Sequence, residues 1–221
     1  IQDTARVLSR YLDGIMIRTF SQKDVETLAK VASIPIINGL TDDEHPCQVL
    51  ADLMTIREKK LILDGLKVAY IGDGNNMCNS LLVACLTLGM NVFIANPSDY
   101  KPPSYYINKG HELANKNGVS FFMTTSPEEA VKDVDVIVTD VWASMGQEEE
   151  CDKRRIDFDG YQVNKKLLTL AKEDTIVLHC LPAHRGEEIT NEILEAHADT
   201  IFEEAENRLH AQKAVLVKLL K

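Results

Sequence analysis

The sequence has no excess of positive charge and no long apolar run. It carries 24 Lys and Arg residues against 34 Asp and Glu residues, which gives a formal net charge of −10 at pH 7. Because no basic stripe offsets this charge, we expect no nucleic-acid partner. No apolar run approaches the ~18 residues of a membrane span, so we expect no membrane partner either. An anionic substrate would need a local cluster of Arg and His to overcome the overall field.

Cysteine is scarce, and its spacing is not that of a pair. The chain has five cysteines, Cys47, Cys78, Cys85, Cys151 and Cys180. Their odd number and the absence of any CxxC spacing argue against a disulfide scaffold and against a structural zinc site. A reducing, cytoplasmic location is therefore predicted.

Apolar, β-branched runs alternate along the chain with amphipathic segments of helix length. This alternation predicts βα crossovers and mainly parallel sheets, with strands apolar enough to be covered on both faces. The predicted strands are Ile15–Arg18, Pro35–Asn38, Lys67–Ile71, Asn91–Ala95, Val119–Met123, Val134–Thr139 and Thr175–Leu178. The predicted helices are Lys23–Ala32, Pro46–Lys60, Asn76–Leu88, Ser104–Asn117, Asn164–Ala171 and Ile189–His197, followed by an amphipathic segment at Ala205–Lys221.

The order of these elements predicts three parts. Residues 1–60 would form a partial αβ unit, residues 61–202 a complete five-stranded α/β domain, and residues 203–221 a helix that returns to the first unit. The chain starts at Ile1 in a segment that is already helical in pattern, so we expect a fragment that begins inside a fold.

The sequence His45-Pro46-Cys47-Gln48 reads as the start of a helix. Proline fits the first helical position, where a backbone N–H is not needed. His45 would then cap the helix with Gln48 three residues on, so that both side chains reach a ligand beside free N–H groups that favour anions. The alternative is an ordinary helix start with a polar cap.

The sequence Gly72-Asp73-Gly74-Asn75-Asn76 follows a predicted strand and invites a dinucleotide-binding interpretation. That fingerprint needs a third glycine where Met77 stands and a ribose-binding acid where the next strand ends at Asn96. NAD binding is therefore disfavoured. The adjacent amides could instead hold a carboxylate, or the segment could simply be a polar turn.

Asp140 ends another predicted strand, and Ser144-Met145-Gly146 follows it in a loop. An Asp at the carboxyl end of a strand can pair with a substrate ammonium group, while a Ser-Met-Gly turn can present N–H groups to a carboxylate. Together they would clamp an amino acid. The alternative is an Asp that closes a turn beside a core residue, Trp142.

The tetrapeptide His179-Cys180-Leu181-Pro182 follows the last predicted strand, at the end where open α/β sheets bind ligands. Cys180 could be a nucleophile, but neighbouring strand residues point to opposite faces, so His179 would not serve as its base. A zinc site formed by His179, Cys180 and His184 lacks a fourth ligand at the usual spacing. Arg208, in the first turn of the final helix, could be either an anion ligand or a surface cation.

The order and spacing of these motifs, ending with Glu204-Ala-Glu-Asn-Arg208, resemble the ornithine carbamoyltransferases along essentially the whole chain. Aspartate carbamoyltransferases share the His-Pro-x-Gln element but are not expected to carry the Ser-Met-Gly loop or His-Cys-Leu-Pro. The resemblance implies two doubly wound α/β domains with parallel sheets, the first incomplete here. It makes residues 1–60 part of a carbamoyl-phosphate domain and residues 61–202 an ornithine domain.

The resemblance also implies a role for each motif. The residues implied around carbamoyl phosphate are Arg18, His45, Gln48 and Arg208. Those implied around the α-amino and α-carboxylate groups of ornithine are Asn76, Asp140, Ser144 and Met145. Cys180 and Leu181 are implied near the δ-amine. Arg18, His45, Cys180 and Arg208 form the predicted catalytic set. No cofactor or metal is needed, and the active form is expected to be a homotrimer or a multiple of trimers.

The implied reaction transfers the carbamoyl group of carbamoyl phosphate to the δ-amine of ornithine and yields citrulline and phosphate, a step of arginine biosynthesis or urea-cycle type. N-acetylornithine or putrescine remain as alternative acceptors. The Ser-Thr-Arg-Thr-Arg phosphate loop of the family is not among these 221 residues. We therefore expect the chain alone to be inactive, or else to be an amino-acid-binding module that has lost carbamoyl transfer.

Overall fold

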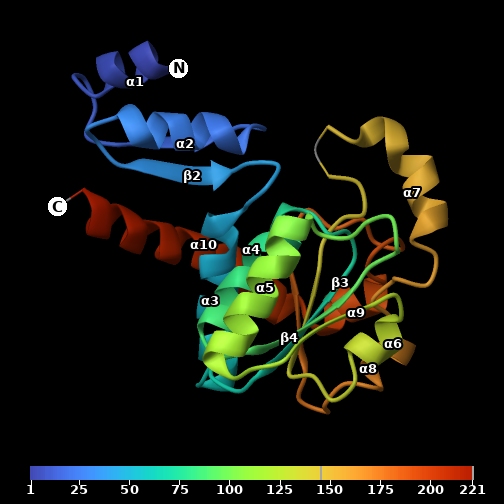
Figure 1. Cartoon of the computed structure of the whole chain (residues 1–221). Coiled ribbons are helices and arrows are strands. Elements are labelled where there is room, and N and C mark those ends of the chain that lie inside the picture. The colour runs from blue at the N-terminus through green and yellow to red at the C-terminus, as the bar shows by residue number, and fades with distance from the viewer. Residues whose placement is uncertain (145, 221) are drawn as a thin grey trace.

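The computed structural model describes residues 1–144 and 146–220, and its strands form two parallel sheets of unequal size (Figure 1). The smaller sheet pairs β1 (Ile15–Arg18) with β2 (Ile36–Leu40). Helix α2 (Gln22–Val31) connects the two strands, and α1 (Gln2–Leu8) precedes them. Ser21 starts α2 because its hydroxyl accepts a hydrogen bond from the N–H of Asp24.

The larger sheet has the strand order β5-β4-β3-β6-β7, with every neighbouring pair parallel. Its strands are β3 (Lys67–Ile71), β4 (Asn91–Ala95), β5 (Phe121–Thr124), β6 (Val136–Thr139) and β7 (Ile176–His179). The helices that connect or cover them are α3 (Pro46–Lys60), α4 (Asn76–Thr87), α5 (Ser104–Asn117), α6 (Pro127–Ala130), α7 (Cys151–Asp157), α8 (Lys165–Leu168), α9 (Asn191–Ala196) and α10 (Ala198–Leu219), with a 3₁₀ turn at Glu148–Glu150.

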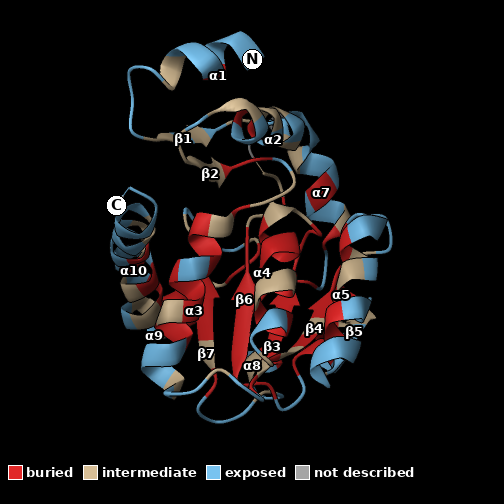
Figure 2. Cartoon of the chain, turned by 60° about the vertical axis from the view of Figure 1, so that its left-hand side comes forward, coloured by how far each residue is buried: buried red, intermediate tan, exposed pale blue. Residues whose placement is uncertain are grey.

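Helices cover both faces of the larger sheet, so each face has its own apolar core. One core packs β-strand residues against α3, α4 and α5 and includes Ile56, Leu81 and Leu113. The other contains Phe158 and Ile193 and lies against α6, α8 and α9. Figure 2 shows the buried residues concentrated in the strands and in α3 and α4. Burial on both faces explains why β6 can be wholly apolar except for its final threonine.

The order in which the chain adds strands to the larger sheet reverses between β3 and β6. From β3 the chain proceeds to β4 on one side, whereas β6 pairs with the other side of β3. In open α/β sheets, ligands bind at the carboxyl ends of the strands at such a switch point. The loops that begin at Gly72 and Asp140 leave the sheet at this point, which is where the sequence places two of its motifs.

Side chains of α4 bind the segment that joins the smaller sheet to α3. Asn76 Nδ2 donates to the carbonyl oxygen of Thr41 at 2.6 Å, and Asn79 Nδ2 donates to that of Asp43 at 3.0 Å. The N–H of His45 donates to Ser80 Oγ at 2.8 Å. These three bonds hold the start of α3 against the start of α4.

The predicted α/β class with parallel sheets is confirmed, but several elements differ from the prediction. The final helix begins at Ala198 rather than Ala205, so Arg208 lies in the middle of a 22-residue helix and not in its first turn. The last strand includes His179, which was predicted to follow it. The division at residues 60/61 and 202/203 remains a prediction. Among the described residues, no helix combines the length and apolar character that crossing a bilayer requires.

Candidate active site

A cavity of about 700 Å³ lies between the two sheets. It is lined by the ends of β1, β6 and β7, by the starts of α3 and α4, and by α10. Eight of the ten predicted site residues line it: Arg18, His45, Asn76, Asp140, Ser144, Cys180, Leu181 and Arg208. Gln48 lies behind the cavity wall, and Met145 lies outside the described residues.

His45 occupies the N-cap position of α3, but its side chain makes no capping hydrogen bond. The residue is 6% exposed, and its Nδ1 atom is buried without a hydrogen-bond partner among the described residues. Burial lowers the pKa of His45 to about 4 together with the smaller effects of the nearby Arg208 and Arg18, which act in the same direction. The imidazole is therefore neutral near pH 7 and can offer a polar ring nitrogen to a ligand.

Arg208 lines the cavity from α10, and Gln48 holds it from behind. Arg208 Nη1 donates to Gln48 Oε1 at 3.0 Å. Gln48 is 1% exposed, and its amide nitrogen donates to Asp52 and Glu204, both at 2.9 Å. Gln48 therefore contacts the Arg208 guanidinium and does not itself line the cavity, and its predicted contact with carbamoyl phosphate stays a prediction.

Asp140 is 6% exposed at the end of β6 and is held by three donors. Asn75 Nδ2 donates to Oδ2 at 2.8 Å, while the N–H of Val141 and the Cys180 thiol donate to Oδ1 at 2.8 and 3.0 Å. Asn75 also caps α4 by accepting hydrogen bonds from two backbone N–H groups. The sequence singled out Asn76 but missed Asn75, although an Asn directly before a predicted helix is a recognised capping signal.

Cys180 is present as a thiol. Burial raises its pKa well above the ordinary value, and the adjacent Asp140 carboxylate raises it further. A thiolate beside that carboxylate would be repelled rather than stabilised. This environment supports a neutral thiol that lines the cavity, and it disfavours a covalent nucleophile.

His179 is not among the residues that line the cavity, in line with the expectation that it would not serve as a base for Cys180. Its ring is fully buried; Nδ1 accepts a hydrogen bond from the N–H of Leu181 at 2.9 Å, and Nε2 lies 3.0 Å from Glu188. His179 offers a ligand atom within 4.8 Å of Asp140 and Cys180, a grouping that could hold a metal ion. Both of its ring nitrogens are already hydrogen bonded, however, and the thiol retains its proton, so the three residues are poorly arranged as a metal site.

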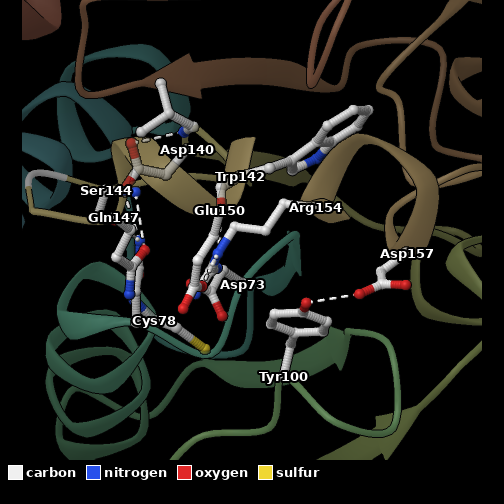
Figure 3. Close-up of polar contacts among 12 residues, drawn as sticks. Asp73, Cys78, Tyr100, Asp140, Trp142, Ser144, Gln147, Glu150, Arg154 and Asp157 are labelled. Carbon is white, nitrogen blue, oxygen red and sulfur yellow. Dashed lines mark hydrogen bonds and ion pairs between the residues drawn. The ribbon is translucent and has the colours of Figure 1, made fainter. Parts of the chain in front are cut away.

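The loop after Asp140 is held to the loop after β3 by a buried ion pair (Figure 3). Arg154 Nη1 donates to Asp73 Oδ2 and to the carbonyl oxygen of Trp142, both at 2.7 Å. Its guanidinium also lies 4.8 Å from the centre of the Tyr100 ring, and its Nε bonds Glu150 at 2.9 Å. Burial raises the pKa of Asp73 to about 6, and Arg154 opposes that rise.

Residues 147–155 are mostly polar or charged, and helix α7 begins among them at Cys151. Arg154 in this helix is only 6% exposed, because Asp73 and the carbonyl oxygen of Trp142 bind its guanidinium. In the same region Gly74 is required by a close approach of two backbones, because a Cβ atom there would lie 2.2 Å from the nitrogen of Pro102.

Family models match nearly the whole chain. The model "Aspartate/ornithine carbamoyltransferase, carbamoyl-P binding domain" matches residues 1–58, and "Aspartate/ornithine carbamoyltransferase, Asp/Orn binding domain" matches residues 64–219. Both models describe enzymes of the carbamoyl-transferring class. The chain belongs to the aspartate/ornithine carbamoyltransferase family.

Individual relatives point to one branch of that family. Ornithine carbamoyltransferase of Pyrococcus horikoshii is 56% identical over 220 residues, which cover 100% of this chain and 69% of that protein. The enzyme of the same name from Anoxybacillus flavithermus is 54% identical, with 70% of its length covered. The structure of ornithine carbamoyltransferase from Pyrococcus furiosus superposes with a TM-score of 0.94 at 53% identity, covering 99% of this chain and 70% of that one. The anabolic enzyme of Campylobacter jejuni gives 0.95 at 42% identity, with coverages of 99% and 72%.

Proposed function

We propose that these residues form most of the active site of an enzyme that transfers the carbamoyl group of carbamoyl phosphate to the δ-amine of ornithine, with citrulline and phosphate as products, and that the chain alone is inactive. The observation that carries the proposal is one cavity lined both by cations, Arg18 and Arg208, and by a buried carboxylate, Asp140. Cations suit a phosphate dianion, and a carboxylate suits a substrate ammonium group. The relatives' shared name supplies ornithine as the acceptor, and the description of the family model supplies carbamoyl phosphate as the donor.

Carbamoyl phosphate would bind beside His45, Arg18 and Arg208. The guanidinium groups can donate to its phosphate oxygens, and the start of the 15-residue helix α3 adds backbone N–H groups that favour an anion. A neutral His45 can donate a hydrogen bond to the carbonyl oxygen without a proton being transferred.

Ornithine would bind between the starts of α4 and the loop after β6. Asp140 would pair with the α-ammonium group, because its carboxylate faces the cavity and is fixed by Asn75. Asn76 donates its amide hydrogens to Thr41, so its oxygen is the atom oriented to accept from the same ammonium. Ser144 and Met145 would hold the α-carboxylate, and Cys180 and Leu181 would line the space around the side chain.

The reaction would proceed by direct attack. The lone pair of the neutral δ-amine forms a bond to the carbonyl carbon of carbamoyl phosphate, and negative charge builds on the carbonyl oxygen. Arg208, Arg18 and His45 stabilise that charge. The bond from the carbonyl carbon to the phosphate oxygen then breaks, and the departing phosphate takes the proton that the amine loses. Much of the acceleration would come from holding two substrates together in one cavity.

The acceptor is tested by kinetics of the full-length protein with ornithine, N-acetylornithine and putrescine, each with carbamoyl phosphate. We expect ornithine to have the highest kcat/KM, because only ornithine offers both a free α-ammonium and an α-carboxylate. Preferential use of putrescine, which lacks the carboxylate, would show that the assigned acceptor is wrong.

We also propose that the full-length protein assembles as a homotrimer or a multiple of trimers and works in the cytoplasm. The first proposal rests on the family resemblance. The second is supported by five free cysteines in the described chain, which fit a reducing compartment. Sedimentation or light scattering of the purified protein gives the oligomeric state, and a monomer or dimer at micromolar concentration would contradict it.

A further inference from the structure

Two acidic side chains are buried behind the cavity with no basic side chain bonded to either among the described residues. Asp52 on α3 is 0% exposed, and Glu204 on α10 is 1% exposed. The two helices lie side by side (Figure 2), and the amide nitrogen of Gln48 brings the two carboxyl groups together. Asp52 Oδ2 is buried without a hydrogen-bond partner among the described residues, and a proton shared with Glu204 would satisfy it.

Both carboxyl groups converge on the amide of Gln48. Its Nε2 atom donates to Asp52 Oδ1 and to Glu204 Oε1, each at 2.9 Å. With both amide hydrogens bound to acids, the amide oxygen must point the other way, where it accepts from Arg208 Nη1 at 3.0 Å. A rotated amide would place its oxygen against two acids and its hydrogens against a guanidinium.

Glu204 also reaches the larger sheet. Its Oε2 atom accepts a hydrogen bond from the N–H of His179 at 2.9 Å, one residue before Cys180. Glu204 and Arg208 are four residues apart on one face of α10, and Gln48 and Asp52 are four apart on α3. The network thus connects both helices, the end of β7 and the cation of the cavity.

Burial and the negative groups that face the pair favour retention of a proton by the two acids. Arg208 is the cation on its side of α10, while Asp140 and the Cys180 thiol face it from the ends of β6 and β7. His45 on α3 is neutral near pH 7, and the His179 ring is turned towards Glu188. Burial raises the pKa of Asp52 to about 6 and that of Glu204 well above its ordinary value.

We propose that Asp52 and Glu204 are positioning residues that fix the Gln48 amide and through it the Arg208 guanidinium. The proposal rests on the proposed function, because it assigns to Arg208 the stabilisation of carbamoyl phosphate. It predicts an asymmetry between the two acids. Asp52 uses one oxygen to accept the hydrogen bond from Gln48, and its other oxygen is free to interact with Glu204. Glu204 needs two acceptor oxygens, one for Gln48 and one for the N–H of His179.

Two substitutions that remove one ionisable group each therefore differ in their expected effect. In Asp52→Asn the new amide oxygen accepts from Gln48 as the carboxylate oxygen does, and the new NH₂ group can donate to Glu204, so the bond to Gln48 is kept. In Glu204→Gln one acceptor oxygen becomes a donor, which faces either His179 N–H or the Gln48 amide. One donor is then placed against another, and the orientation of Gln48 is lost.

The experiment measures steady-state kinetics of the full-length protein and its variants. Because the affected hydrogen bond involves a charged group, Glu204→Gln should lower kcat/KM for carbamoyl phosphate about 10- to 100-fold, with the KM for ornithine changed less than about threefold. In Asp52→Asn, kcat/KM for carbamoyl phosphate and the KM for ornithine should both stay within about threefold of the parent values. Asp52→Ala removes the acceptor oxygen, so its kcat/KM for carbamoyl phosphate should fall as far as that of Glu204→Gln. The matched control is Glu206→Gln, an exposed acid two residues along α10.

A structural measurement keeps the proposal independent of activity. Crystal structures of Asp52→Asn and Glu204→Gln should show Gln48 bonded to Arg208 in the first and released in the second, with the Arg208 guanidinium displaced. An unmoved guanidinium in Glu204→Gln, or a loss in Asp52→Asn as large as that in Glu204→Gln, would overturn the proposal. If the parent protein forms no citrulline, the proposed function fails, yet the crystal structures still decide whether the acid pair positions Arg208.

Discussion

The cavity has a helix side, formed by Gln48, Asp52, Glu204 and Arg208, and a loop side, formed by the segments that follow β3 and β6. On the helix side, the three groups behind the guanidinium are at most 1% exposed, and each is bonded to another. On the loop side, Arg154 is buried, but its partner Glu150 has a side chain that is 56% exposed.

This difference suggests that the two sides play different parts in binding. Interactions that are buried and mutually bonded are fixed before a substrate arrives, and electrostatic stabilisation of a transition state depends on such fixed dipoles and charges. A loop with exposed anchors can adjust when a flexible substrate enters. We expect substitutions on the helix side to reduce kcat and those on the loop side to act first on ornithine binding.

The largest effect is expected from Arg208→Ala. Loss of the preorganised cation should reduce kcat/KM for carbamoyl phosphate about 10²- to 10³-fold, the range found when one donor to a developing oxyanion is removed. Arg208→Lys should retain only part of the parent kcat/KM for carbamoyl phosphate, because an ammonium group lacks the planar pair of donors that a guanidinium offers. Lys213→Ala, an exposed cation on the same helix, is the control. Equal loss in the control would assign the effect to net charge instead.

The next largest effect is expected from Asp140→Asn on the loop side. Removing the charge partner of the α-ammonium should weaken transition-state binding by a few kcal/mol, which lowers kcat/KM for ornithine about 100-fold, mainly through a higher KM. Steady-state kinetics with putrescine, which has no α-substituents, provide the comparison, since its poor rate should fall much less. An equal fall for both amines would mean that Asp140 acts on the shape of the cavity and not on the ammonium.

The buried, neutral His45 should make the free energy of unfolding depend on pH. Its folded pKa of about 4 lies below the ordinary value of 6.5, so its contribution to stability is present above pH 6.5 and is lost as the pH falls towards 4. Relative to His45→Gln, the parent protein should lose on the order of 2 kcal/mol between pH 7 and pH 5. Urea unfolding at the two pH values measures this difference, and a constant gap between parent and variant would contradict the neutral, buried imidazole.

The smallest effect is expected from Cys180→Ser. A serine hydroxyl can donate to Asp140 as the thiol does, so turnover should fall by less than about tenfold. Activity that survives the substitution separates a residue that lines the cavity from a covalent nucleophile. Mass spectrometry of the parent enzyme during turnover gives the second reading, and a carbamoylated Cys180 would refute the direct attack of the amine.

The sequence predicts the parts of the fold that depend on local patterns. Strands such as Lys67–Ile71 and Asn91–Ala95 and the helix Pro46–Lys60 have the predicted bounds, because their apolar periodicity and proline signal are local. Polar residues at the ends of β1, β6 and β7 were recognised as candidate ligands for the same reason. Parallel pairing brings the ends of β6 and β7 to one edge of the larger sheet, whereas the end of β1 reaches the same cavity from the smaller sheet.

Contacts between distant segments could not be predicted in this way. Gln48 and Glu204 are 156 residues apart, and nothing in either segment indicates that the other lies beside it. Arg154 stands in a run of charged residues that looks solvated, yet it is buried because Asp73, 81 residues away, supplies its partner. Both cases depend on which helix packs against which strand end, and this is a property of the tertiary structure.

The three hydrogen bonds from α4 to residues 41–45 have a mechanical consequence. They tie the segment that carries His45 to the larger sheet, even though the segment leaves the smaller one. The same segment is also bonded to the smaller unit, where the N–H of Asp42 donates to the carbonyl oxygen of Phe20 at 2.8 Å and Thr41 Oγ1 donates to Gln22 at 2.7 Å. The segment therefore couples the two sheets, and the N–H of His45 belongs to the side that is bonded to α4. In hydrogen exchange, the amide of His45 should exchange at the rate of the α4 amides and not at that of the β2 amides. Ser80→Ala, which removes the acceptor of this amide, should make it exchange faster.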